Sequence, residues 1–245
     1  LRLDETLERL AAGTELPLKD FKAALKKAEK LGLPAYAAGN PEGFLYPATY
    51  DVPPDADAAS VLTQLFDAYA VAAEEAGVER TRRDPEEIVI IASLVEAEAR
   101  LDGDFGKVAR VVYNRLEAGM PLQFDSTVNY ALNADKEIVT YEDLGEDSPY
   151  NTYQNDGLPP KPISGARPEA LHAAVREALL EVGFALDLPA LEPRHPVLPR
   201  NDIGKCELPG AVGDSGSERP GGPGREDMDM GQGSSVSGNG SRNVV

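Results

Sequence analysis

The stretch Asp84-Pro85-Glu86-Glu87-Ile88-Val89-Ile90-Ile91-Ala92-Ser93-Leu94-Val95-Glu96-Ala97-Glu98-Ala99-Arg100 decides the predicted fold. Asp84 can cap a first helical turn, Pro85 has the fixed φ that suits the first helical position, and Glu87 has the spacing of a capping box. Between residues 88 and 97 only Ser93 and Glu96 are polar, so a helix here has no polar face. We therefore expect a buried helix over about 85–101.

Two glutamates near the end of this helix differ in their predicted surroundings. The helix carries an apolar stripe of Ile91, Leu94 and Val95. Glu98 lies three to seven residues after these positions, so its carboxylate shares the stripe and must be paired or protonated. Glu96 points elsewhere and has Arg100 four residues on, which predicts an ordinary surface ion pair.

Composition limits the classes of function. The chain has 245 residues, of which 42% are hydrophobic, enough for a real core. A formal charge of -18 without clustered Lys and Arg argues against a nucleic-acid partner. Cys206 is the single cysteine and His172 and His195 are the two histidines, so we expect no disulfide, no metal and no cofactor.

Helical periodicity recurs along the chain, and one segment departs from it. Amphipathic helices are predicted at about 3–12, 18–31, 58–76, 104–118, 128–132 and 168–182. Prolines interrupt the aromatic segment 40–54, which should form an extended edge strand with turns. Its Phe44, Tyr46 and Tyr50 would share one face, and this face either covers the core or lines a groove. The basic run Arg80, Arg82 and Arg83 should be solvated.

Two polar loops stand out between the helices. The first offers Gln123, Asp125, Ser126, Thr127 and Asn129 in quick succession, either as a capped turn or as ligand contacts. The second carries Tyr150, Asn151, Thr152 and Tyr153, and its prolines and Gly157 make it stiff. Polar, aromatic and stiff loops often hold ligands on a scaffold.

Five ordered blocks resemble one family. The blocks are Glu42-Gly43-Phe44-Leu45-Tyr46-Pro47, Ile91-Ala92-Ser93-Leu94-Val95-Glu96-Ala97-Glu98, Tyr113-Asn114-Arg115-Leu116, Gly119-Met120-Pro121-Leu122-Gln123 with Asp125 and Thr127, and Tyr150-Asn151-Thr152-Tyr153 with Gly157-Leu158-Pro159-Pro160. Together they resemble the endolytic murein transglycosylases, the MltG or YceG-like family, over about residues 3–163. Five blocks at compatible distances are far more specific than any one of them.

The resemblance implies a lytic transglycosylase. Enzymes of this family cleave the β-1,4 bond between N-acetylmuramic acid and N-acetylglucosamine inside nascent glycan strands, and leave 1,6-anhydro-N-acetylmuramic acid ends. It further implies peptidoglycan strands and wall-synthesis proteins as partners. The implied location is the extracytoplasmic face of the cell membrane, where an N-terminal anchor missing from this sequence would hold the protein.

The resemblance points to Glu98 as the catalytic residue, with Glu96 as runner-up. One carboxyl suffices for this chemistry, because the attacking group is the 6-hydroxyl of the sugar itself. Such an acid needs a pKa above the usual 4.3 or so, which apolar surroundings provide. The implied substrate-binding residues are Gln123, Asp125, Ser126, Thr127, Asn129, Tyr150, Asn151, Thr152 and Tyr153.

The predicted fold class is α+β: a mainly helical catalytic domain around the buried helix, with a small β element. We divide the chain into a small helical region at 1–40, the catalytic domain at 41–185 and a disordered tail at 186–245. Residues 201–245 hold 11 glycines and six serines. The tail departs from the family pattern after Ser164-Gly165-Ala166-Arg167 and resembles out-of-frame translation of a GC-rich gene.

Two other functions remain open from the sequence. One is a two-carboxylate glycoside hydrolase in which Asp125 assists Glu98 as base or nucleophile. The other is a catalytically inactive protein that binds peptidoglycan as a scaffold, which the altered tail favours.

Overall fold

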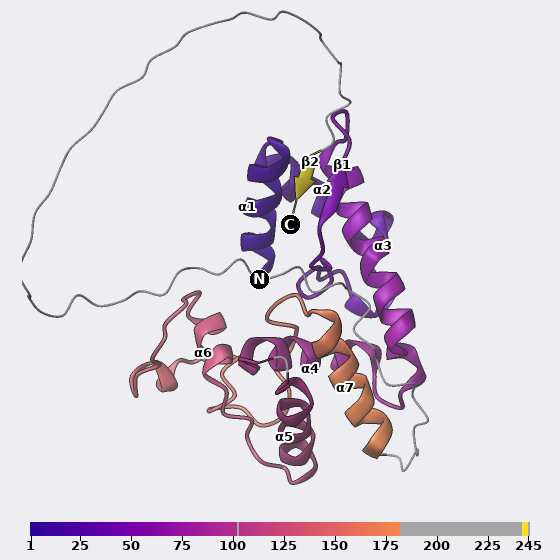
Figure 1. Ribbon diagram of the computed structural model, residues 1–245. Coiled ribbons are helices and arrows are strands. Elements are labelled where there is room, and N and C mark those ends of the chain that lie inside the picture. The colour runs from indigo at the N-terminus through magenta and orange to yellow at the C-terminus, as the bar shows by residue number, and fades with distance from the viewer. Residues whose placement is uncertain (102, 182–241, 245) are drawn as a thin grey trace, which may run out of the picture. The chain divides into compact units, whose positions relative to one another are not determined.

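The structure is a computed structural model that describes residues 1–101, 103–181 and 242–244, all within one compact unit. Its helices are α1 (Leu3–Thr14), α2 (Leu18–Leu25), α3 (Ala58–Ala76), α4 (Pro85–Glu98), α5 (Phe105–Glu117), α6 (Asp125–Ala131) and α7 (Pro168–Glu181) (Figure 1). Short 3-10 turns follow at η1 (Ala28–Leu31), η2 (Ala35–Ala37), η3 (Val78–Arg80) and η4 (Asp143–Gly145). The strands are β1 (Tyr50–Val52) and β2 (Arg242–Val244).

The predicted mainly helical character is confirmed. In the described part of the chain the only sheet pairs β1 with β2 antiparallel, with Asp51 opposite Asn243. Two short strands do not establish an α+β class, which stays a prediction. The predicted tail lies outside the described residues apart from 242–244, which form β2.

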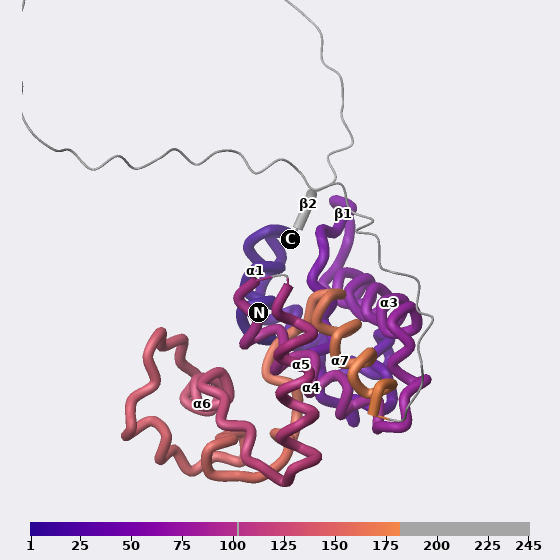
Figure 2. Tube along the Cα trace, turned by 60° about the horizontal axis from the view of Figure 1, so that its bottom comes forward, coloured from indigo at the N-terminus to yellow at the C-terminus, as the bar shows by residue number. Residues whose placement is uncertain are grey.

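Helix α4 forms the centre of the unit, as its sequence predicts. All residues from Ile88 to Val95 are buried, and α4 packs against α5, α6 and α7. Figures 1 and 2 both show α6 and α3 on opposite sides of it. The helix ends at Glu98 rather than near residue 101, because the backbone of Ala99 turns to an extended conformation at ψ 117°.

The start of α4 is fixed by its own cap and by distant helices. Asp84 accepts a hydrogen bond from the backbone N–H of Glu86 at 2.8 Å, and Pro85 occupies the first turn. The predicted capping box is replaced by an ion pair, since the Glu87 carboxylate lies 3.5 Å from the guanidinium of Arg83.

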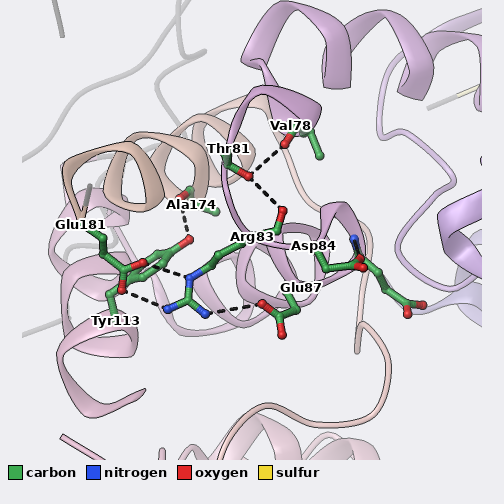
Figure 3. Close-up of polar contacts among 9 residues, drawn as sticks. Val78, Thr81, Arg83, Asp84, Glu87, Tyr113, Ala174 and Glu181 are labelled. Carbon is green, nitrogen blue, oxygen red and sulfur yellow. Dashed lines mark hydrogen bonds and ion pairs between the residues drawn. The ribbon is translucent and has the colours of Figure 1, made fainter. Parts of the chain in front are cut away.

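Arg83 is half-buried rather than solvated. Its Nε and Nη2 each donate to the Glu181 carboxylate at 3.0 Å, and its guanidinium lies 5.0 Å from the centre of the Tyr113 ring (Figure 3). The Tyr113 hydroxyl in turn donates to the carbonyl of Ala174 at 2.8 Å. Arg83 therefore joins α4 to α5 and α7, which local sequence could not indicate.

The helix predicted for residues 18–31 is two elements. Helix α2 ends at Leu25, and η1 follows. Because η1 packs against α3, it places Ala28 in the core, and Gly32 ends it with a φ of 104°. Helix α3 matches its predicted bounds, with a capping box between Asp57 and Ser60.

Two of the family-like blocks contact the segment that follows the last block. At Gly43, φ is 89° and a Cβ would lie 2.5 Å from Cβ of Pro162, so only glycine fits there. The buried hydroxyl of Ser93 accepts a hydrogen bond from the backbone N–H of Ile163 at 3.1 Å. The first and second blocks thereby both hold the segment that follows the last block.

The aromatic face of residues 40–54 covers the core. Phe44 is fully buried, with its ring centre 5.0 Å from that of Tyr69. Only β1 within this segment is a strand, and the Tyr50 hydroxyl donates to the carbonyl of Tyr46 at 2.6 Å.

Candidate functional site

A cavity of about 620 Å³ lies where the end of α4 meets the start of α6. Seven of the eleven predicted site residues line it: Glu96, Glu98, Gln123, Asp125, Ser126, Asn129 and Tyr153. Thr127, Tyr150, Asn151 and Thr152 are not among its lining residues. The two polar loops and the central helix therefore converge on one site.

Glu98 is the last residue of α4, and its half-buried side chain reaches the cavity. Ile91, Leu94 and Val95 are fully buried below it, so the predicted stripe exists. The carboxylate itself is not enclosed in that stripe, because the helix ends here. Instead its Oε1 accepts a hydrogen bond from the backbone N–H of Ser126 at 3.4 Å.

Glu96 makes a different set of contacts from those of Glu98. Its Oε1 accepts from Nε of Arg167 at 2.8 Å, and its Oε2 accepts from the backbone N–H of Arg167 at 3.0 Å. The predicted ion pair between Glu96 and Arg100 is therefore wrong, and Arg100 lines the same cavity. Both glutamates line the cavity, but Glu96 also ties the end of α4 to the start of α7 through Arg167.

The hydroxyl of Ser126, the residue whose backbone N–H binds Glu98, has no hydrogen-bond partner among the described residues, although its oxygen is buried. A buried unpaired hydroxyl is unfavourable unless a ligand or a water molecule pairs with it. The oxygen is enclosed by the protein in this structure, so a water molecule or a small shift of the loop would be needed to pair it.

Asp125 and Tyr153 form a polar pair on the cavity wall. The Tyr153 hydroxyl donates to Oδ1 of Asp125 at 2.7 Å. Burial, then the hydrogen bond to Asp125 and the charges of Asp125 and Glu98, raises the pKa of Tyr153 to about 12. The phenol therefore remains protonated at neutral pH and can act as a donor.

Gln123 reaches the cavity from an unusual backbone conformation. Its φ is 53°, in the left-handed region, and its backbone N–H donates to the carbonyl of Thr152 at 3.1 Å. Such a conformation costs on the order of 1–3 kcal/mol and is often found at functional sites. The second polar loop thus holds the first in a strained position.

Thr127 and Thr152 are buried behind the wall. Their hydroxyls lie 2.9 Å apart, Thr127 donates to the carbonyl of Phe124, and the N–H of Phe124 donates to the hydroxyl of Thr152 at 3.0 Å. Their contacts join the two loops.

Asn151 is also fully buried. Its Nδ2 donates to the carbonyls of Leu144 and Glu146, and its Oδ1 accepts from the N–H of Tyr153. These bonds fix the backbone from which the Tyr153 side chain extends.

Asn129 lines the cavity, but its side chain is bonded within its own loop. Its Nδ2 donates to the carbonyl of Lys136 at 2.9 Å, and its Oδ1 accepts from the backbone N–H of Lys136 at 3.1 Å. Tyr150 lies behind the wall, with its ring centre 4.8 Å from that of Tyr130.

The sequence analysis missed Tyr130 in the cavity wall and Glu42, to which Tyr130 is bonded. Tyr130 lines the cavity, and its hydroxyl donates to Oε2 of Glu42 at 3.3 Å. Glu42 is buried and also accepts from the backbone N–H of Leu3 at 3.0 and 3.2 Å. Burial raises the pKa of the Glu42 carboxyl, although these hydrogen bonds oppose the shift. Its place at the head of the first family-like block was the available signal.

A larger cavity of about 860 Å³ lies at Arg83 and Arg110, and no predicted site residue lines it. Both guanidiniums are paired, with Glu181 and Glu177 respectively. The smaller cavity at Glu98 is therefore the better candidate site.

Among the described residues, no group of three or more His, Cys, Asp and Glu side chains is placed to hold a metal ion. In that same part of the chain, no helix has the length and apolar character needed to cross a bilayer.

Comparison with known proteins gives one consistent family. A profile of the YceG-like family matches residues 1–181. The chain is 40% identical over 138 residues to an endolytic murein transglycosylase of Bacillus subtilis, covering 55% of this chain and 38% of that protein. It is 32% identical over 143 residues to an endolytic murein transglycosylase of Streptococcus pneumoniae, covering 56% of this chain and 26% of that protein.

A solved structure is similar as well. The crystal structure of a yceG-like protein from Listeria monocytogenes superposes with a TM-score of 0.64 at 31% identity, covering 71% of this chain and 64% of that one. The chain spans less than two-fifths of the length of the curated relatives named above.

Proposed function

The chain belongs to the YceG-like family, and from this membership and the geometry around Glu98 we propose that it is an endolytic lytic transglycosylase of peptidoglycan. The proposed reaction cleaves the β-1,4 bond between N-acetylmuramic acid and N-acetylglucosamine and leaves 1,6-anhydro-N-acetylmuramic acid ends. The observation that carries this proposal is the difference between the two glutamates. Both side chains line the cavity, but both oxygens of Glu96 bind Arg167, whereas Glu98 accepts one hydrogen bond, from the backbone N–H of Ser126.

Glu98 supplies both proton transfers. As an acid it protonates the glycosidic oxygen while the bond from that oxygen to the anomeric carbon breaks. As the conjugate base it then takes the proton of the 6-hydroxyl, whose oxygen bonds to the same carbon. The proton count is restored and no water is consumed. The N–H of Ser126 holds one carboxylate oxygen, which orients the carboxyl for both steps.

The remaining predicted residues divide into those that would contact the sugars and those that hold the contacting residues in place. Gln123, Asp125 and Tyr153 present polar groups to the cavity and would bind the hydroxyl and N-acetyl groups of the sugars. The set Thr127, Asn129, Tyr150, Asn151 and Thr152 supports these residues through the bonds and ring contact described above. Catalysis by one glutamate requires such positioning, because the reacting hydroxyl belongs to the substrate.

The proposed setting is cell-wall synthesis. Nascent glycan strands at the extracytoplasmic face of the cell membrane are the proposed substrate, and wall-synthesis proteins are the proposed partners. Both follow from the family to which the chain belongs.

Product analysis tests the proposal. The purified chain would be incubated with purified peptidoglycan, and the soluble products would be analysed by mass spectrometry. Anhydro ends that disappear with Glu98→Gln are the expected result. Reducing ends would replace the transglycosylase with a hydrolase, and binding without any soluble product would indicate a scaffold.

A further inference from the structure

Gln123 is a residue of the cavity wall whose backbone needs support. Among the described residues other than glycine, four have a positive φ, and of these four Gln123 lines the 620 Å³ cavity. The left-handed conformation costs free energy for any residue with a Cβ, so a free glutamine would leave it. The contacts that hold this backbone therefore decide where the Gln123 side chain lies.

The peptide units on both sides of Gln123 are held by hydrogen bonds. The Gln123 N–H donates to the carbonyl of Thr152 at 3.1 Å, and the Phe124 N–H donates to the Thr152 hydroxyl at 3.0 Å. The other polar atom of the first unit, the carbonyl oxygen of Leu122, accepts a hydrogen bond from Nη1 of Arg115. Because the two flanking peptide planes set φ and ψ of a residue, these bonds together fix the conformation of Gln123.

Arg115 reaches this backbone from the last turn of α5 and is half-buried. Its own carbonyl accepts a hydrogen bond from the N–H of Met120 at 2.8 Å, so both ends of the segment 120–122 are bonded to Arg115. Its guanidinium lies 5.9 Å from the centre of the Phe124 ring, which is a cation–π contact. Arg115 therefore contacts the residue before Gln123 and the residue after it.

We propose that Arg115 is a positioning residue that holds the carbonyl of Leu122 and thereby keeps Gln123 in the left-handed conformation that brings its side chain to the cavity. Arg115 is not among the residues that line this cavity, so it acts through Gln123 and not on the sugar. Without the Arg115 side chain the Leu122 carbonyl is released, and Gln123 can relax to a negative φ. The inference rests on the proposed function, because it assigns the Gln123 side chain to the bound substrate.

A simpler role for Arg115 would be to stabilise the end of α5. A cation in the last turn of a helix is favourable by itself, because the free carbonyls there carry partial negative charge. In that role Arg115 would contribute to the free energy of unfolding but not to the placement of Gln123. The two roles therefore predict different effects on substrate affinity.

Arg115→Met tests the positioning role with Arg176→Met as a matched control. Arg176 is exposed on α7 and lines none of the cavities described above. Arginine and methionine have similar helix propensities, so neither change should disturb its helix. We expect Arg115→Met to raise KM for glycan strands roughly three- to tenfold with kcat changed by less than about twofold, and Arg176→Met to change neither. Arg115→Gln, which also lacks the charge, repeats the comparison if Arg115→Met does not fold.

The same change in a Gln123→Gly background shows whether Arg115 acts through Gln123. Glycine adopts a positive φ readily and has no side chain to place, so the support becomes unnecessary. Gln123→Gly should raise KM by itself, and adding Arg115→Met should raise it by less than about twofold more. If Arg115→Met raises KM by the same factor in both backgrounds, the positioning role is overturned.

Amide hydrogen exchange measures the support without any catalysis. The amides of Gln123 and Phe124 are the two that are bonded to Thr152. Arg115→Met should speed their exchange roughly tenfold relative to Arg176→Met, because the loop opens more often when the Leu122 carbonyl is free. A role confined to the end of α5 would lower the melting temperature and leave both the exchange of these amides and KM unchanged.

The outcomes distinguish the positioning role from the proposed function. If anhydro products form and Arg115→Met matches Arg176→Met in KM and in exchange, the positioning role is wrong and the function stands. Faster exchange with an unchanged KM would also overturn it, because the placement of Gln123 would then not affect the substrate. If no product forms but Arg115→Met alone speeds the exchange, Arg115 holds the Gln123 backbone and the catalytic function fails. If there is neither product nor a difference in exchange, both are overturned.

Discussion

Arg167 donates hydrogen bonds to both carboxylate oxygens of Glu96, from its Nε at 2.8 Å and from its backbone nitrogen at 3.0 Å. The same guanidinium lies 5.0 Å from the centre of the Phe105 ring. Glu96 thereby joins α4, α5 and α7, and it lines the cavity together with Glu98, two residues later. The two glutamates of one short motif thus make different contacts.

Replacement of each glutamate by glutamine should distinguish the proposed catalytic role of Glu98 from a structural role of Glu96. Glu98→Gln should lower the rate of anhydro-product formation roughly 10²-fold or more with little change in melting temperature, since the variant cannot transfer the proton. Glu96→Gln should keep most of the activity but lower the free energy of unfolding by about 1 kcal/mol, because the pair with Arg167 is partly exposed. Rates and melting curves measured on the same preparations check both, and retained activity in Glu98→Gln would overturn its assignment.

Loss of the Tyr153 hydroxyl should weaken substrate binding. Tyr153→Phe removes the donor to Asp125, and we expect KM to rise roughly three- to tenfold, as for the loss of one hydrogen bond. Tyr141→Phe is the control, because Tyr141 is 95% exposed and its side chain can lose a hydroxyl without consequence. Equal KM values for the two variants would remove Tyr153 from the site.

The buried pair of Thr127 and Thr152 should contribute mainly to the free energy of unfolding. Thr127→Val leaves the carbonyl of Phe124 and the hydroxyl of Thr152 without this partner, and should lower the free energy of unfolding by about 1–3 kcal/mol. Thr63→Val, on the half-buried surface of α3, serves as a control with a much smaller expected change. Urea denaturation measures both.

Glu42 and Tyr130 should be energetically coupled. In a double-mutant cycle, Glu42→Gln and Tyr130→Phe should together destabilise the protein less than the sum of the single changes, by about 0.5–3 kcal/mol. Additive effects would mean that their hydrogen bond contributes nothing.

The contribution of Glu42 to the free energy of unfolding should depend on pH. Because burial raises the pKa of the Glu42 carboxyl above 4.5, the folded state holds its proton more tightly than the unfolded state does. The stabilisation from Glu42 is therefore complete below pH 4.5 and is lost as the pH rises through the raised pKa. The stability of the unaltered chain relative to Glu42→Gln should fall over that range, as urea denaturation at several pH values can show.

His172 should produce the opposite trend near neutrality. Burial lowers the pKa of His172 below 6.5, against the charges of Glu169 and Glu75. The unfolded state then binds more protons than the folded state just below pH 6.5, so stability is lost as the pH falls through this value. His172→Gln should reduce the difference in unfolding free energy between pH 7.5 and pH 5.5, and an unchanged difference would contradict the shift.

Local pattern determined most of the helical framework. The bounds of α3, the buried centre of α4 and the cap at Asp84 all follow from residues three or four positions apart or from one turn of backbone. The polar loops were also recognisable from composition, and five of their nine predicted residues line one cavity together with Glu96 and Glu98.

Only the tertiary structure decided what each polar side chain does. Glu96 binds a residue 71 positions away rather than Arg100, and Thr127 and Thr152 bond each other across 25 positions. Glu98 accepts a hydrogen bond from Ser126, which lies 28 positions further along the chain. Its carboxylate lies at the cavity and not within the apolar stripe, because α4 ends at this residue. Helical periodicity depends on neighbours within a turn, so the sequence alone determined which segments form and which of their faces are buried. The partners of buried polar groups depend on how distant segments pack, and that is settled only when the chain is folded.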